Sequence, residues 1–189
     1  MKHLIIYAHP NDESLNHHLK HTVVERLKSK NHKIEIRDLY QMNFNPTLSF
    51  EDIKGQRMGK VEDDVKQEQD YISWSDHIIF IYPIWWTGMP AIMKGFIDRV
   101  FSYGFAYRYN KGVQVGLLTG KRTTIINTHG KSQAEYESSG MHKALSLTTD
   151  KGIFTYCGLE INKHFFFDKA DRPNSKNIEE WEKQIAEAF

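Results

Sequence analysis

The feature that most constrains the fold of this chain is a regular alternation of short apolar runs and longer amphipathic segments. The clearest run is His77–Tyr82, which is unbroken and apolar, as is typical of a central strand in a parallel sheet. Segments with helical spacing separate such runs, and the first of them carries Leu15, Leu19, Val23 and Leu27. Because parallel neighbours need crossover connections, the alternation predicts a doubly wound α/β fold.

The pattern predicts five strands, at His3–Ala8, Lys33–Arg37, His77–Tyr82, Thr123–Asn127 and Glu160–Phe167. It also predicts five helices: after the N-cap Ser14, around Val61–Ile72, from Pro90 to Val100, over residues 135–151, and at the end with Ile178, Trp181 and Ile185. Residues 41–60 read as irregular, and the charged run Glu62–Glu68 as a solvated helix face. We find no linker and no repeat, so a single domain over residues 1–189 is expected.

Composition excludes several function classes. The net charge is +1, which argues against a nucleic acid or an anionic membrane as partner. No apolar stretch approaches the length that crosses a bilayer. Cys157 is the single cysteine, which agrees with a reducing cytoplasm and favours a buried filler over a catalytic thiol.

Ligands of doubly wound folds bind at the carboxyl ends of the strands. This rule selects three loops, 8–14, 83–90 and 128–136. The first has no glycine-rich nucleotide motif, yet it leads into a helix N-terminus that favours an anion. His9, Ser14 and Asn16 offer donors there, although a plain helix cap is an almost equal alternative for Ser14.

The second loop places Trp85 and Trp86 side by side after a strand. Successive residues of a strand point to opposite faces, so at least one indole should lie at the surface or against a ligand. Packing on a helix or a second subunit is the alternative. The third loop holds Asn127, Thr128 and His129, and Gly130 permits a turn with free N–H groups near a ligand. A phosphate seat, an aromatic wall and a polar edge together suit a flavin mononucleotide.

Four segments carry a family resemblance: IIYAHPNDESLNHHL, DLYQMNFNP, YPIWWTGMPAIMKGFIDRVFSYGFAY and the spacing of Tyr136 and His142. Over about residues 3–167 the chain resembles the flavodoxin-like NAD(P)H:quinone oxidoreductases. That family includes mammalian quinone reductases, shorter bacterial members and ancillary proteins of potassium-efflux systems. The resemblance implies a flavodoxin-like five-stranded parallel sheet of order 2-1-3-4-5.

The resemblance also implies roles for particular residues. The segment that holds the flavin phosphate matches His9, Ser14, Leu15 and Asn16. The segment along the isoalloxazine matches Pro83, Ile84, Trp85 and Trp86, and the segment at its polar edge matches Asn127, Thr128, His129 and Gly130. Tyr136 and His142 fall on the pair that steadies charge on the reduced flavin. Asn127 and His129 depart from the family's Thr-Thr-Gly-Gly pattern, and a histidine side chain there would crowd or tune the flavin.

The implied activity is two-electron, ping-pong hydride transfer from NADH or NADPH through FMN, with FAD as the alternative, to quinones or related acceptors. Homodimers are typical of the family, and dimerisation is also favoured by the aromatic residues of Phe101–Tyr109. Two alternatives are a flavin-binding regulatory subunit of a potassium-efflux transporter and a small flavodoxin-type electron carrier. A metal at His17, His21 and Glu25 is disfavoured because no fourth ligand is evident, so no metal is expected.

Overall fold

The computed structural model describes residues 1–189, and its main sheet is parallel. The strands of that sheet are β1 (Lys2–Tyr7), β2 (Lys33–Asp38), β3 (His77–Pro83), β6 (Arg122–Thr128) and β7 (Glu160–Phe167). They lie in the order β2-β1-β3-β6-β7, and every neighbouring pair is parallel. This order is the predicted 2-1-3-4-5 order, so the predicted fold class is confirmed.

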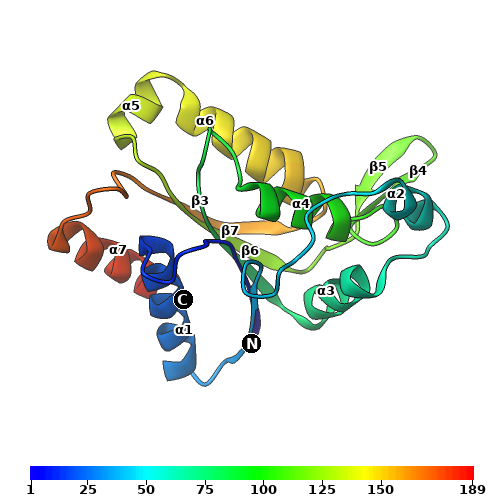
Figure 1. Ribbon diagram of the computed structural model, residues 1–189, viewed down its shortest axis with the longest axis horizontal. Coiled ribbons are helices and arrows are strands. Elements are labelled where there is room, and N and C mark those ends of the chain that lie inside the picture. The colour runs from blue at the N-terminus through cyan, green and yellow to red at the C-terminus, as the bar shows by residue number, and fades with distance from the viewer.

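Helices cover both faces of the sheet (Figure 1). One face carries α1 (Leu15–Ser29) and α7 (Ser175–Ala188), which bury Leu19, Val23, Trp181 and Ile185 against β1, β3 and β7. The other face carries α3 (Asp63–Trp74), α4 (Ala91–Val100) and the π-helix η1 (Leu147–Thr155), which bury Ile72, Phe96 and Phe154. All seven residues of β3 are buried, because β3 is central and covered on both sides. None of the helices is long and apolar enough to span a membrane.

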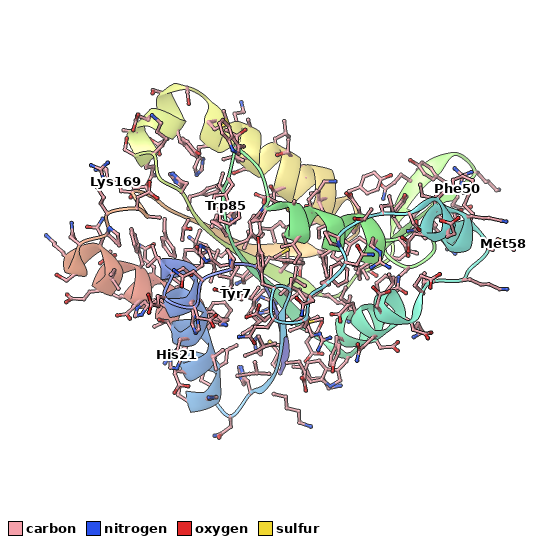
Figure 2. All side chains as sticks on the ribbon, in the orientation of Figure 1. Tyr7, His21, Phe50, Met58, Trp85 and Lys169 are labelled. Atoms are coloured by element: carbon pink, nitrogen blue, oxygen red, sulfur yellow. The ribbon has the colours of Figure 1, made fainter.

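The interpretation of residues 41–60 as irregular is wrong for one segment, α2 (Phe50–Arg57). The Ser49 side chain accepts from the Asp52 N–H while the Asp52 carboxylate accepts from the Ser49 N–H, a capping box that starts the helix. Phe50 and Ile53, its large apolar residues, are exposed, so α2 has no apolar stripe by which to recognise it. Figure 2 shows Phe50 and Met58 at one end of the molecule, well away from Trp85 near its middle.

Two further expectations need correction. The helix expected over residues 135–151 is divided at Gly140, where φ is 73°, into α5 (Gln133–Ser138) and α6 (Met141–Ser146), and then continues as η1 to Thr155. The Glu62–Glu68 run is not solvated throughout: Glu68 lies on the inner side of α3, as its helical spacing from Val65 and Ile72 predicts, and it accepts three hydrogen bonds from Arg37 of β2. Residues 107–116 form a hairpin, β4 (Tyr107–Asn110) with β5 (Val113–Gly116).

Candidate functional site

A cleft of about 560 Å³ lies at the carboxyl edge of the sheet. It collects residues from four loops, and ten of the fourteen predicted site residues are among them. The lining is His9, Glu13, Ser14, Leu15, Asn16, His18, Pro83, Ile84, Trp85, Thr128, His129, Gly130, Ala170, Asp171, Pro173 and Ile178. The sheet order explains the gathering, because β1, β3 and β6 are adjacent and all end there.

The start of α1 forms the floor of the cleft. Ser14 caps the helix, as predicted, by accepting a hydrogen bond from the His17 N–H at 3.2 Å, which leaves its own hydroxyl proton free to donate. The N–H groups of Leu15 and Asn16 have no intrahelical acceptor, because they begin the helix. The helix dipole adds partial positive charge at the same point.

Asn16 provides the most specific feature of the cleft. Its side chain is only 2% exposed, and its Oδ1 accepts a 2.7 Å hydrogen bond from the Thr128 hydroxyl. In this orientation of the amide Nδ2 is the free end, and it is buried without a partner. A buried donor without an acceptor is costly, so the arrangement suits an anion or a carbonyl group bound in the cleft.

Two histidines of the cleft, His9 and His129, are disfavoured as cations by their burial. Burial lowers the pKa of His9 and that of His129 below the ordinary value of 6.5. His9 Nδ1 lies 3.1 Å from the backbone of Asn11, so its Nε2 is the free ring nitrogen. No lysine or arginine lines the cleft, and Glu13 and Asp171 add carboxylates to its rim. An anion there would be held by neutral dipoles.

The second loop turns sharply between Trp85 and Gly88, whose backbones exchange two hydrogen bonds of 3.1 Å. The two central residues, Trp86 and Thr87, have φ values of 49° and 56°. That geometry matches a type I′ turn, which favours Asn and Gly, so an aromatic and a β-branched residue are strained there. Trp85 is 41% exposed, lines the cleft and lies 5.7 Å from the His9 ring. Trp86 is fully exposed and does not line it.

The other three predicted site residues lie beside the cleft. Asn127 is 2% exposed and faces a neighbouring cavity of about 290 Å³ under the Thr87–Met89 turn. The Tyr136 ring stacks on His129 with centroids 4.3 Å apart, and His142 packs on Phe166 at 4.4 Å. Tyr136 therefore contacts a residue of the cleft, whereas His142 packs on a ring of β7 that does not line it.

The structure adds a fourth wall that the sequence analysis missed. Ala170, Asp171 and Pro173 follow β7, and they obey the same strand-end rule that selected the other three loops. Asp171 also explains Gly130, which needs no left-handed backbone: a Cβ on Gly130 would lie 2.5 Å from Asp171 Oδ2. A side chain at this position would require the exposed Asp171 carboxylate to move.

The sheet order and the cleft at its carboxyl edge define a flavodoxin-like protein. A family model described as Flavodoxin-like fold matches residues 1–189, and the chain belongs to that family. An uncharacterized NAD(P)H oxidoreductase of Haemophilus influenzae is 41% identical over 161 residues, which are 85% of this chain and 80% of that protein.

Two further relatives have assigned activities in their names. NAD(P)H dehydrogenase [quinone] 1 of Rattus norvegicus is 33% identical over 84% of this chain, and the match spans 65% of the rat protein. The solved NAD(P)H:quinone oxidoreductase of Methanothermobacter marburgensis superimposes with a TM-score of 0.88 at 25% identity, covering 100% of this chain and 96% of that one. The chain is thus a homologue of NAD(P)H dehydrogenase (quinone)-type oxidoreductases, as the resemblance predicted.

Proposed function

We propose that this protein is a flavin-dependent NAD(P)H oxidoreductase that reduces quinones or related small acceptors by two-electron ping-pong hydride transfer. The observation that carries the proposal is the unpartnered, buried Asn16 Nδ2 beside free N–H groups at the start of α1, with Trp85 across the same cleft. These are the donors and the aromatic wall that a flavin with a phosphate tail requires. The names of the relatives support the reaction class.

The residues fit FMN by their chemistry. The phosphate would be held by Ser14, Leu15 and Asn16, and the ring would lie along Pro83, Ile84 and Trp85, with its polar edge toward Thr128–Gly130. A bound flavin supplies hydride chemistry that amino acid side chains lack. We prefer FMN to FAD and expect either NADH or NADPH as the reductant.

The chain's own contribution is to bind, orient and adjust charge. In the third loop the Thr128 hydroxyl and the His129 N–H already donate within the chain, so the Gly130 N–H is the donor that would favour negative charge at the polar edge of a reduced ring. We assign Tyr136 and His142 to the same task, acting beside His129. Tyr136→Phe keeps the ring stack and removes only the hydroxyl, so it should slow reduction by NAD(P)H in stopped-flow measurements while flavin stays bound. An unchanged rate removes Tyr136 from the mechanism.

Purification provides the direct test. The protein should be yellow or should take up FMN, mass analysis of the released flavin should separate FMN from FAD, and NAD(P)H should be consumed with a benzoquinone. Protein that stays colourless and ignores added FMN and FAD contradicts the proposal. Binding without turnover would favour the regulatory alternative, a flavin-binding partner of a potassium-efflux transporter.

We also propose a cytoplasmic, single-domain subunit that forms homodimers. Both core clusters pack on one sheet, which supports a single domain. A groove of about 820 Å³ between α2, α4 and η1 is lined largely by apolar residues and carries the exposed Tyr103 and Tyr109. Exposed aromatic patches of this kind favour protein contacts. Analytical ultracentrifugation should give a dimer, and Tyr109→Asp should weaken it.

A further inference from the structure

A chain of polar side chains lies buried behind the cleft. Asp150, in the first turn of η1, has its Oδ1 2.8 Å from His164 Nδ1 in the middle of β7. His164 Nε2 lies 2.8 Å from Asn127 Oδ1, and Asn127 Nδ2 donates to the backbone carbonyl of Tyr82 at 3.0 Å. The side chains of His164 and Asp150 are only 6% and 18% exposed. Asp150 therefore connects to β3 through β7 and β6.

The direction of each hydrogen bond in this chain follows from its last acceptor, the backbone carbonyl of Tyr82. A backbone carbonyl can only accept, so Asn127 must turn its NH₂ group toward Tyr82 and its oxygen toward His164. That oxygen can only accept, so His164 Nε2 must carry a proton. The 2.8 Å contact between His164 Nδ1 and the Asp150 carboxyl also needs a proton between its two atoms. The pair therefore holds one proton more than a carboxylate beside a neutral imidazole.

The surroundings isolate this pair. The Phe166 ring stacks on His164 with centroids 4.0 Å apart, and His142 of α6 lies on that phenyl ring. The Tyr82 phenol of β3 is the titratable group next to Asp150; burial is the main cause and Asp150 a smaller cause of its raised pKa. No lysine or arginine makes a hydrogen bond or ion pair with either member. Asp150 also lies in a π-helix, a conformation that often marks functional positions.

The crosslink lies directly before two cleft walls. Tyr82 precedes Pro83, Ile84 and Trp85, and Asn127 precedes Thr128. We propose that Asp150 and His164 are positioning residues: their shared extra proton locks the Asn127 amide onto the Tyr82 carbonyl and so adds a side-chain link to the backbone ladder that joins the two strand ends at the ligand cleft. This inference rests on the proposed function only for the identity of that ligand.

Loss of the proton shared by Asp150 and His164 would break the hydrogen bond between Asn127 and the Tyr82 carbonyl. The carboxylate keeps Nδ1–H, so the lone pair of Nε2 then faces Asn127 Oδ1, and the two acceptors repel each other. The amide must rotate, and the Tyr82 carbonyl loses its donor. Affinity for FMN should therefore fall by about three- to ten-fold when the proton is lost, which corresponds to one buried hydrogen bond.

Two variants distinguish the effect of the proton relay, that is, the hydrogen-bonded chain Asp150–His164–Asn127, from the effect of side-chain packing. In Asp150→Asn, the new amide donates to His164 Nδ1, so Nε2 stays protonated and FMN affinity should remain at its low-pH value throughout. His164→Leu removes the relay, so its FMN affinity should not change with pH. In His21→Gln, which replaces an exposed histidine, FMN affinity should depend on pH as it does in the parent protein. A parent affinity independent of pH, or an Asp150→Asn variant that still follows pH, overturns the proposal.

Nitrogen NMR of the protein without flavin tests the relay separately from cofactor binding. The hydrogen-bond geometry requires both ring nitrogens of His164 to be protonated in this state of the protein. A neutral His164 with its lone pair on Nε2 overturns the proposal even if FMN binds. Protonated nitrogens in a protein that ignores FMN would refute the proposed function and leave the relay standing.

Discussion

At the scale of single residues, Asn16 combines two tasks on one amide. Its oxygen satisfies Thr128, and its nitrogen is left for a ligand. Asn16→Asp keeps the acceptor and replaces the donor with a negative charge. This change should weaken FMN binding by about 10- to 100-fold, the range for a hydrogen bond to a charged group. Flavin fluorescence quenching measures the affinity.

A matched variant isolates the ligand contact. Thr128→Val breaks the hydrogen bond to Asn16 Oδ1 but retains Nδ2, so it should lower stability more than it lowers FMN affinity. Equal losses of affinity in Asn16→Asp and Thr128→Val would mean that Asn16 acts only by holding the loop.

At the strained turn of Trp86 and Thr87 we predict a change that raises the stability of the protein. Trp86 and Thr87 have left-handed backbones, and Trp86 buries no surface within the chain. The double change Trp86→Asn and Thr87→Gly supplies the residues that a type I′ turn prefers. It should raise the free energy of unfolding in urea by about 1–3 kcal/mol. If stability does not rise, the turn is not strained in solution.

At the scale of elements, Arg99 joins three parts of the chain on one side of the sheet. Its buried guanidinium, on α4, donates to Asp52 of α2, to Asp64 of α3 and to the Asn45 carbonyl. The opposite charges beside it raise the pKa of Arg99, Asp64 most strongly. Arg99→Ala leaves Asp52 buried without its partner.

We expect Arg99→Ala to lower the free energy of unfolding by about 3–5 kcal/mol. Lys94→Ala on the same helix is the control: its pair with Asp98 is exposed and should contribute only about 0.3–0.5 kcal/mol. Urea titration measures both. Similar losses in the two variants would refute a special role for the buried cluster.

At the scale of the whole molecule, a histidine group lies at the end of the sheet opposite the cleft. His3 Nε2 lies 2.9 Å from His32 Nδ1, and His77 contacts the Thr124 hydroxyl. Burial lowers the pKa of His3 to about 4 and that of His77 to about 3, from 6.5. Both are neutral in the folded protein at pH 7.

The sign of the pH effect follows from these pKa values. Below pH 6.5 the unfolded chain binds protons that the folded chain refuses, so stability falls from about pH 6.5 toward pH 4. The slope should approach about 1.4 kcal/mol per pH unit for each histidine. Replacing His3 and His77 with Gln should flatten the curve, whereas His21→Gln should not. A curve unchanged by the double replacement would contradict the assignment.

The parts of the molecule that could be predicted from the sequence are those whose apolar residues recur at the spacing of a strand or a helix. The five strands and the three loops after β1, β3 and β6 follow from such patterns. Helix α2 was missed because Arg99, rather than an apolar stripe, holds it in place. The hydrogen-bond partners of Asn127 were also out of reach, because His164 and Asp150 come from later segments whose register with β6 only the folded sheet defines.

The hydrogen bond between Thr128 and Asn16 joins positions 112 apart along the chain. In the sheet β3 lies between β1 and β6, so we expect the binding cleft to form only when all three strands have paired. Flavin should consequently bind after the sheet has formed, so that it stabilises the folded protein without directing its folding. Added FMN should then slow global unfolding and raise the melting temperature, without accelerating refolding.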